Sequence, residues 1–200
     1  RPESSEGAAI TVRVPDVTGV NLETSNGPVH VTNASGLAEL DTSNGSIVVN
    51  NHAGDVNAST SNGQIEINDV TGSVDASSSN GSVDLINIAG RSFAETSNGN
   101  VLVQLARTGR GPCIIDTSNG NAELIVGPGF RGELACETSN GRIVADIPHA
   151  EIQKNDRTSM VLRVGEEGGR SRVSTSNGSI RVNYVGDPRV IVPAQSSRVP

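Results

Sequence analysis

Apolar and polar positions alternate in short stretches along nearly the whole chain. The segment GSIVVNNHAGDVNASTSN at 45–62 divides into two halves of nine residues, each of which begins with glycine and then alternates apolar and polar residues. Alternation with a period of two between glycine-containing turns is typical of a β-strand with one buried face. The pattern therefore predicts two short strands and two turns in each such stretch of eighteen residues.

One short motif, Thr-Ser-Asn-Gly or a close variant, marks every second turn. It occurs eight times, and its asparagines are separated by 18, 18, 18, 18, 21, 21 and 37 residues. The sequence RTSM at 157–160 puts Ser159 where a further asparagine would divide the last step into 19 and 18, and Gly7 stands 19 residues before the first motif asparagine. A period this regular indicates a solenoid, here of about ten coils. The motif residues are Asn26, Asn44, Asn62, Asn80, Asn98, Asn119, Asn140 and Asn177, followed by Gly27, Gly45, Gly63, Gly81, Gly99, Gly120, Gly141 and Gly178.

Stacked copies of this unit predict the fold. We expect an all-β, single-domain parallel β-solenoid over residues 1–200, with coils of 18–21 residues between about 8 and 192 and two short strands in each coil. Val, Ile and Leu recur at the third and fifth positions after the motif asparagine and should line the core. The stretch PHAEIQKNDRTSM at 148–160 departs from the pattern and predicts an irregular insertion.

The motif itself has a structural explanation. Asn and Gly enter positive φ at little cost, so the pair predicts a sharp turn between the two sheets. The neighbouring Thr and Ser hydroxyls can satisfy backbone groups of the turn. Identical amide side chains stacked in successive coils can also hydrogen-bond along the axis as a ladder. We therefore interpret the repeated corner as a structural element rather than as a catalytic site.

The TSNG-x-I/V-x-V/L units resemble those of bacterial adhesin-type families of β-strand repeats, and the resemblance extends from about Ala8 to Val192. It implies a cell-surface or secreted β-solenoid. The resemblance is specific for architecture and does not assign an activity, because fold does not fix function.

Composition excludes some classes of function. The net charge is −7, tryptophan is absent, and Phe93, Phe130 and Tyr184 are the only aromatic residues. Without a basic stripe or stacking aromatic residues, nucleic-acid binding is not expected. No apolar run reaches membrane-spanning length, so no membrane span is expected in this chain. The chain begins at Arg1 without a methionine, so we expect a processed or trimmed protein, and any signal peptide or anchor would lie outside this sequence.

Residues that could carry chemistry are few. His30, His52 and His149 occupy different places in the coil and predict scattered surface histidines, with no catalytic residues and no enzyme activity. Cys113 and Cys136 are expected in adjacent coils but two positions apart along the strand. This offset predicts two buried free thiols rather than a disulfide.

One acidic column precedes the motif threonines. Like charges on neighbouring strands repel, and a hard cation could relieve that repulsion, although the column lacks a full cage of oxygen ligands. The aspartate position of calcium-binding nonapeptide repeats is instead occupied by residues such as Asn50, Asn68 and Ile86. We therefore expect no resident metal or cofactor and keep cation binding as an alternative. The column comprises Glu23, Asp41, Glu95, Asp116 and Glu137, with Ser59 and Ser77 between the second and third.

Two further alternatives stay open. Glycosylation sequons at Asn44, Asn80 and Asn177 follow from the motif itself, whereas those at Asn33 and Asn57 lie outside it. The column of motif threonines on a flat face also resembles the arrays of ice-binding proteins, which carry two threonines per coil rather than one.

Strand-like sequence continues close to both ends of the chain, so the terminal coils could stack end to end. Such head-to-tail contacts between copies would build an open filament, and the residues expected at that contact are Ile10, Val12, Val190 and Val192. The sequence thus predicts a non-enzymatic, extracellular or cell-surface structural or adhesive protein, whose partners are further copies and cell-surface or matrix glycans. The alternative is a surface module that binds a cation or a carbohydrate along the acidic column.

Overall fold

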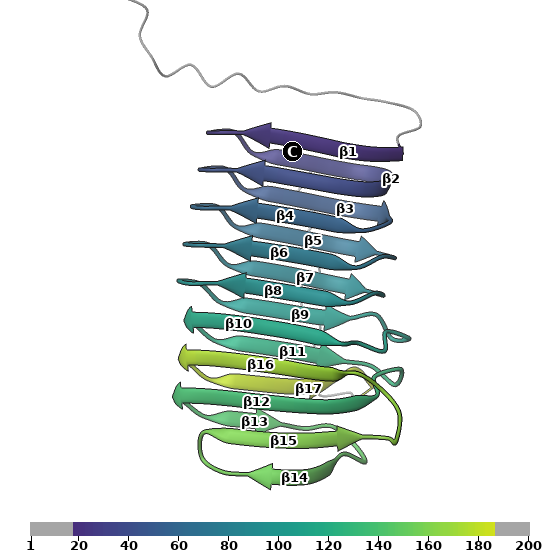
Figure 1. Cartoon of the computed structure of the whole chain (residues 1–200), viewed down its shortest axis with the longest axis vertical. Helices are drawn as coiled ribbons and strands as arrows, with labels where there is room; N and C mark the ends of the chain where they lie inside the picture. Colours follow the sequence, from purple (N-terminus) through teal and green to yellow (C-terminus); the bar gives the residue numbers. More distant parts are fainter. Residues whose placement is uncertain (1–17, 187–200) are drawn as a thin grey trace, which may run out of the picture.

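The protein is a parallel β-solenoid, which confirms the predicted fold class. The computed structural model describes residues 18–186, and these form seventeen strands stacked along one axis (Figure 1). No helix in this range is long and apolar enough to cross a membrane. The strands are β1 (Thr18–Thr24), β2 (Val29–Thr42), β3 (Ile47–Ala53), β4 (Val56–Thr60), β5 (Ile65–Val70), β6 (Val74–Ser78), β7 (Val83–Ile88), β8 (Ser92–Thr96), β9 (Val101–Leu105), β10 (Cys113–Asn119), β11 (Ala122–Val126), β12 (Gly132–Asn140), β13 (Ile143–Ala145), β14 (Glu151–Asn155), β15 (Ser159–Val164), β16 (Arg170–Asn177) and β17 (Ile180–Tyr184).

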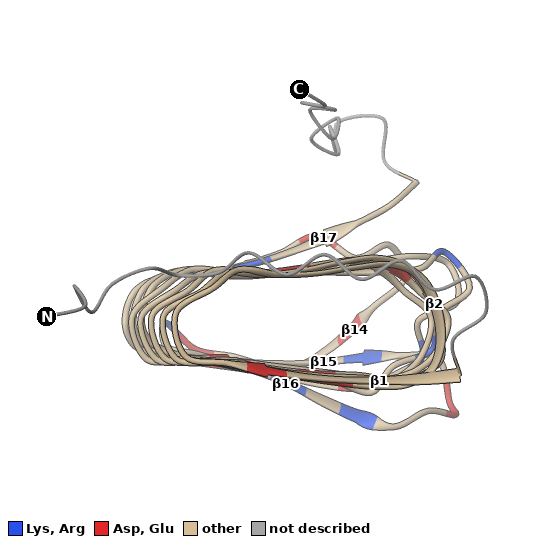
Figure 2. Ribbon diagram, turned by 90° about the horizontal axis from the view of Figure 1, so that it is seen from above, with Lys and Arg blue, Asp and Glu red and all other residues tan. Residues whose placement is uncertain are grey.

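Two flat faces run along the stack, and seen from above they form the long sides of a flattened oval (Figure 2). We call the face that contains β1 the first sheet and the opposite face the second sheet. The parallel order of the first sheet is β1, the end of β2, β4, β6, β8, β10, β16 and β12. The order of the second sheet is the start of β2, β3, β5, β7, β9, β11, β17 and β13. Strand β2 bends at residues 33–36 and so belongs to both.

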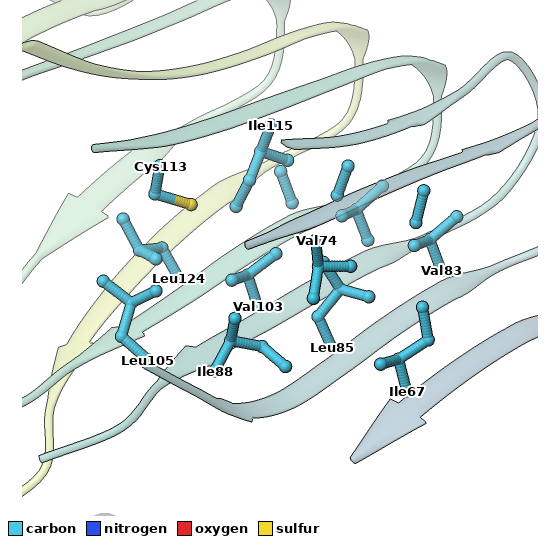
Figure 3. Packing of buried hydrophobic residues seen from close by; sticks show 14 of the residues in the cluster. Ile67, Val74, Val83, Leu85, Ile88, Val103, Leu105, Cys113, Ile115 and Leu124 are labelled. Carbon is cyan, nitrogen blue, oxygen red and sulfur yellow. The ribbon is translucent and has the colours of Figure 1, made fainter. Parts of the chain in front are cut away.

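Aliphatic side chains from the two sheets meet in a thin core (Figure 3). The second sheet contributes larger residues such as Ile65, Ile67 and Leu85, all fully buried, while the first contributes smaller ones such as Ala76 and Ala94. Sheets packed face to face lie about 10 Å apart, and pairing large with small residues across that gap fills it without aromatic side chains. The alternation in the sequence therefore places the inward-facing columns correctly.

The order of the last coils differs from the order of the chain. Strands β16 and β17 lie between β10–β11 and β12–β13, so the last repeat is inserted among earlier ones (Figure 1).

The prediction of ten coils is wrong, because eight copies of the motif corner are stacked in the described residues. The hidden repeat at Ser159 is also wrong, since Ser159 begins an antiparallel strand opposite Glu137.

The stretch predicted as an insertion, 148–160, contains β14 and the start of β15. These two strands form an antiparallel hairpin, and β15 adds antiparallel to β12 at the lower end of the first sheet. All five residues of β14 are exposed, including the charged residues Glu151 and Lys154. A short, charged edge strand of this kind disfavours further edge pairing. The residues predicted for end-to-end contact, Ile10, Val12, Val190 and Val192, lie outside the described residues.

Candidate functional site

The motif asparagines form one continuous amide ladder along the outside of the corner. Each side-chain amide donates to the Oδ1 of the asparagine one level above at 2.8–3.0 Å. The inserted Asn177 takes its place in the ladder, donating to Asn119 and accepting from Asn140. The ladder order is Asn26, Asn44, Asn62, Asn80, Asn98, Asn119, Asn177 and Asn140.

A second ladder lies just inside the first. From the second level down, the threonine or serine two residues before the motif asparagine is buried, and its hydroxyl donates to the carbonyl oxygen of the motif glycine one level above at 2.8–3.3 Å. Thr60, for example, is 4% exposed and donates to Gly45. The alternative of an ice-binding threonine array on this column is therefore wrong, because these threonines face the interior.

The motif glycines are required for a reason that the sequence interpretation missed. Neither they nor the motif asparagines have positive φ, so the predicted left-handed turn is wrong at this corner. Instead, each glycine stacks directly under the one above. A Cβ atom on Gly63 would overlap with the carbonyl group of Gly45, and the same holds down the column as far as Gly141 under Gly178. Only glycine permits this close approach of backbones.

Positive φ occurs at the opposite turn, seven residues after the motif asparagine. Asn33, Asn51, Asp69 and Asn87 have φ of 55–59°, a conformation that Asn and Asp tolerate better than other side chains. They also pair, since Asn51 donates to Asn33 at 2.6 Å and Asn87 donates to Asp69 at 2.7 Å. The recurrence of Asn or Asp at this position was the signal that could have revealed this second column. The sequon residue Asn33 thus takes part in turn pairing, while Asn57 lies exposed on the first sheet.

The predicted acidic column lies on the first sheet beside the corner, but in a different order. Glu23 is the register neighbour of Asp41, and Glu95 is the neighbour of Asp116. Ser174 separates Asp116 from Glu137, because β16 is inserted there. Among residues 18–186, no three His, Cys, Asp or Glu side chains are grouped so that they could hold a metal ion.

Arginines of the inserted strand pair with carboxylates of β12. The Glu137 carboxylate lies 3.3 Å from the guanidinium of Arg172, and Glu133 lies 2.7 Å from that of Arg170. Glu137, at the lower end of the acidic column, is therefore paired with an arginine of the protein itself. This arrangement leaves Glu23–Asp41 and Glu95–Asp116 as the adjacent acidic pairs of the column.

Another acidic pair, absent from the sequence predictions, lies on the second sheet. Glu66 and Asp84 are register neighbours at the fourth position after their motif asparagines. Burial raises the pKa of the Asp84 carboxyl above its ordinary value. A hydrogen bond from Gln64 at 3.0 Å lowers this pKa in part, and the nearby Glu66 charge raises it further. The signal for this pair in the sequence is that both acidic residues stand four residues after a motif asparagine.

The histidines do not form a site. His30 and His149 are exposed as predicted, but the prediction of a surface position is wrong for His52, which is 1% exposed. The bend at Asn51 shifts the alternation of β3, so the His52 ring points inward in register with Val70. Its Nε2 lies 2.8 Å from the carbonyl oxygen of Gly36.

The two cysteines are buried and free, which confirms that prediction. Their predicted adjacency is wrong, since Val173 of the inserted strand lies between Ile115 of β10 and Cys136 of β12. Burial raises the pKa of both thiols, that of Cys136 to about 12 with a smaller contribution from the Glu137 charge. Thiols with such pKa values are poor nucleophiles at neutral pH.

Comparison with known proteins identifies one family. The model of the Toastrack DUF4097 family matches residues 3–183. No curated protein and no solved structure matches this chain. The match agrees with the resemblance to a β-strand repeat family, while the adhesin type stays a prediction.

Proposed function

The chain belongs to the Toastrack DUF4097 family of β-repeat proteins, and from its architecture we propose that it is a non-enzymatic structural or adhesive module outside the cell. The observation that carries this proposal is the continuity of the corner. Amide and hydroxyl ladders pass without interruption through eight levels, including the inserted one. Every level is thereby fixed to its neighbours by backbone, side-chain and core contacts, which gives a stiff unit suited to hold other surfaces at a set distance.

The outer faces supply the adhesive part of the proposal. Side chains on neighbouring strands repeat about every 4.8 Å, so each sheet presents regularly spaced polar groups along one axis. On the first sheet, Glu39, Asn57 and Asp75 form one such row. A periodic row can engage several units of an extended polymer at once, and multivalent contact raises affinity without any single strong site. Cell-surface or matrix glycans are the polymer class we propose.

Exposure outside the cell can be tested through the single lysine. Lys154 is half exposed on β14, so a membrane-impermeant amine reagent added to intact native cells should modify it. Peptide mass spectrometry would locate the label, and the Lys154→Arg variant is the matched control. Modification only after lysis would contradict an extracellular location.

Glycan adhesion and the cation alternative are separable. Retention on immobilised glycans that survives chelator would support the adhesive proposal, and an Asp75→Ala variant should weaken it. A thermal shift with Ca²⁺ that disappears in a Glu23→Gln/Asp41→Asn variant would favour cation binding at the acidic column instead. Binding to neither would leave the structural role as the surviving part of the proposal.

The filament is the more specific form of the structural proposal. The charged strand β14 disfavours strand pairing at the lower end, so the feature that supports end-to-end contact is the distribution of charge along the molecule. Residues 18–99 carry nine acidic and one basic residue, a net charge of −8, whereas residues 100–186 carry nine acidic and ten basic residues, a net charge of +1. Opposed ends of unequal charge attract in a head-to-tail arrangement more than in a head-to-head one. Electron microscopy at several salt concentrations should show end-to-end rods that shorten as salt rises. A strictly monomeric protein at high concentration and low salt would contradict the filament.

A further inference from the structure

The last coil is a separable unit held in a slot between earlier coils. We call β16 and β17, residues 170–184, the terminal coil. It is bounded on one side by β10–β11 and on the other by β12–β13, in parallel register on both sides (Figure 1). Backbone hydrogen bonds close the slot around it, for example from Ala122 to Ser179 at 3.0 Å and from Ile180 to Arg142 at 2.9 Å.

The two walls of the slot, β10–β11 and β12–β13, have the same strand register relative to each other as each has relative to the terminal coil. Thr117 of β10 and Thr138 of β12 both align with Thr175, so the walls would share one register if they met directly. The chain can reach that arrangement, because the step from Asn98 to Asn119, which crosses one level, is 21 residues. The step from Asn119 to Asn140, which now crosses two levels, is also 21. The stack can therefore close with the terminal coil outside it, and the coil is not needed to bridge a gap in the chain.

A glycine-rich linker joins the terminal coil to the rest of the molecule. Residues 165–169, GEEGG, are all exposed and connect β15 to β16 across β12. The crossing is close, since a Cβ atom on Gly168 would overlap with the Arg131 carbonyl group. The Glu133 amide donates to the Gly169 carbonyl at 3.2 Å. Short linkers that pack tightly in the closed form are the usual hinges of domain swapping.

Charge makes the slot selective for this coil. Arg170 and Arg172 of β16 face Glu133 and Glu137 of β12. In the row of Arg172, the equivalent strands β2, β4 and β6 carry Glu39, Asn57 and Asp75, and in the row of Arg170 the preceding coils carry one arginine, Arg91 beside β8. Among the described coils, only the terminal coil has an arginine in both rows. A coil without arginines would leave the β12 carboxylates unpaired, so the terminal coil has the best charge match for this slot.

From these observations we propose that the slot between β10–β11 and β12–β13 is a docking site for the arginine-bearing terminal coil supplied by a second copy of the chain. In the exchanged form, the 165–169 linker opens as a hinge and the terminal coil of each copy leaves its own slot. It then enters the slot of the other copy, where it makes the same ladder and ion-pair contacts. The proposal concerns lateral exchange between molecules, and it does not depend on the extracellular role or on the end-to-end filament.

Cysteine pairs in the full-length protein test the exchange. Val144 of β13 and Arg181 of β17 are outward-facing register neighbours, so Val144→Cys and Arg181→Cys in separate chains can meet only if coils exchange. The two variants are mixed under reducing conditions, incubated below the unfolding transition, and joined with a short bifunctional thiol reagent. The native Cys113 and Cys136 are buried while the terminal coil is in place, and the β7–β9 control below contains the same two cysteines and so measures their contribution. We expect mixed dimers that increase with incubation time.

Two controls define the outcomes. Asp84→Cys and Leu102→Cys are register neighbours in β7 and β9, a part of the stack that does not exchange, so their mixture should give only background dimers. The Val144→Cys/Arg181→Cys double variant should cross-link within one chain. Mixed dimers no more abundant than the β7–β9 background would overturn the proposal. Failure of the double variant to cross-link internally would also overturn it, because the terminal coil would then not occupy the slot.

The hinge supplies a graded test of the same mechanism. In Gly168→Ala the added methyl group would overlap with the Arg131 carbonyl group when the linker is closed. Overpacking at such a tight backbone contact destabilises the closed form, so mixed dimers should form about tenfold faster. Gly169→Ala is the matched control, since its Cβ atom would lie 3.3 Å from the Pro112 side chain and requires only a small adjustment. Equal exchange rates for the two variants would contradict a role of the linker as hinge.

Discussion

At the scale of single residues, the Thr-Ser-Asn-Gly corner contains those residues that can stack on their own copies in the neighbouring coils. No other residue fits at the motif glycine, because the backbones of successive coils lie too close for a Cβ atom. The motif threonine is buried, and its hydroxyl donates a hydrogen bond to the glycine carbonyl oxygen of the coil above. The sequence predicted the amide ladder from repetition alone. It could not reveal the close approach of the glycines, because that depends on the distance between coils rather than on the conformation of one turn.

Substitution of a glycine inside the column tests this explanation. Gly63→Ala should lower the free energy of unfolding by about 1–3 kcal/mol, because the added methyl group forces the stacked backbones apart. Gly27, at the top of the described column, would place its Cβ atom 3.5 Å from the Thr24 hydroxyl. Gly27→Ala should therefore be close to neutral in urea denaturation. Equal losses for the two variants would show that backbone conformation, not stacking, requires the glycine.

The Asp84–Glu66 pair predicts a specific pH dependence. The pKa of Asp84 is raised in the folded protein above the ordinary 3.8, so the folded state binds more protons between these two values and stability falls as pH rises through that window. Asp84→Asn removes a charge that is unfavourable chiefly because it is partly buried and further because Glu66 is close, so it should stabilise the protein at neutral pH. Relief of the like charges alone accounts for roughly 0.2–1 kcal/mol. The gain should shrink as pH falls toward 4. Asp75→Asn on the first sheet is the control, and a gain independent of pH would contradict the explanation.

The cysteines predict a chemical outcome. Because both thiols are buried and their pKa values are raised, neither should react with a thiol reagent in the native protein at pH 7. Both should react at once in denaturant. Rapid modification of Cys136 without denaturant would mean that the terminal coil leaves its slot often, since Val173 of that coil covers it on one side.

At the scale of elements, the regular coils were predictable and the last ones were not. Alternation and the motif locate β3 to β9, because each strand there pairs with the strand one repeat away. Periodicity divides the step of 37 residues at Ser159 and so predicts a further repeat there. The step instead contains the β14–β15 hairpin and the return of the chain to an earlier level. Periodicity alone cannot predict this order, since β16 fits equally well beside any strand that carries the motif.

Ion pairs between β16 and β12 favour the observed position of β16, and exchanging the two charges tests their contribution. Arg170→Glu would place two carboxylates opposite each other on β16 and β12, and should lower the free energy of unfolding by about 0.5–1 kcal/mol. The added exchange Glu133→Arg in the same chain should restore most of the loss. A double variant no more stable than the single one would show that the pair does not contribute to the insertion.

At the scale of the whole molecule, the protein is one stack in which each level depends on its neighbours. A linear array of coils can unfold level by level, unless the contacts between levels are strong compared with the stability of each level. From the uninterrupted ladders and the shared core we expect strong coupling between the levels of this solenoid. That coupling is the property on which the proposed structural role depends.

The most direct test is amide hydrogen exchange measured for each strand in the native protein. We expect the core amides of β3 to β9 to exchange together, with one free energy equal to that of global unfolding, as in a single cooperative unit. The terminal coil should exchange faster through its own opening. Graded protection that falls from level to level between β3 and β9 would contradict the account, because it would describe a chain of independent coils rather than one stiff rod.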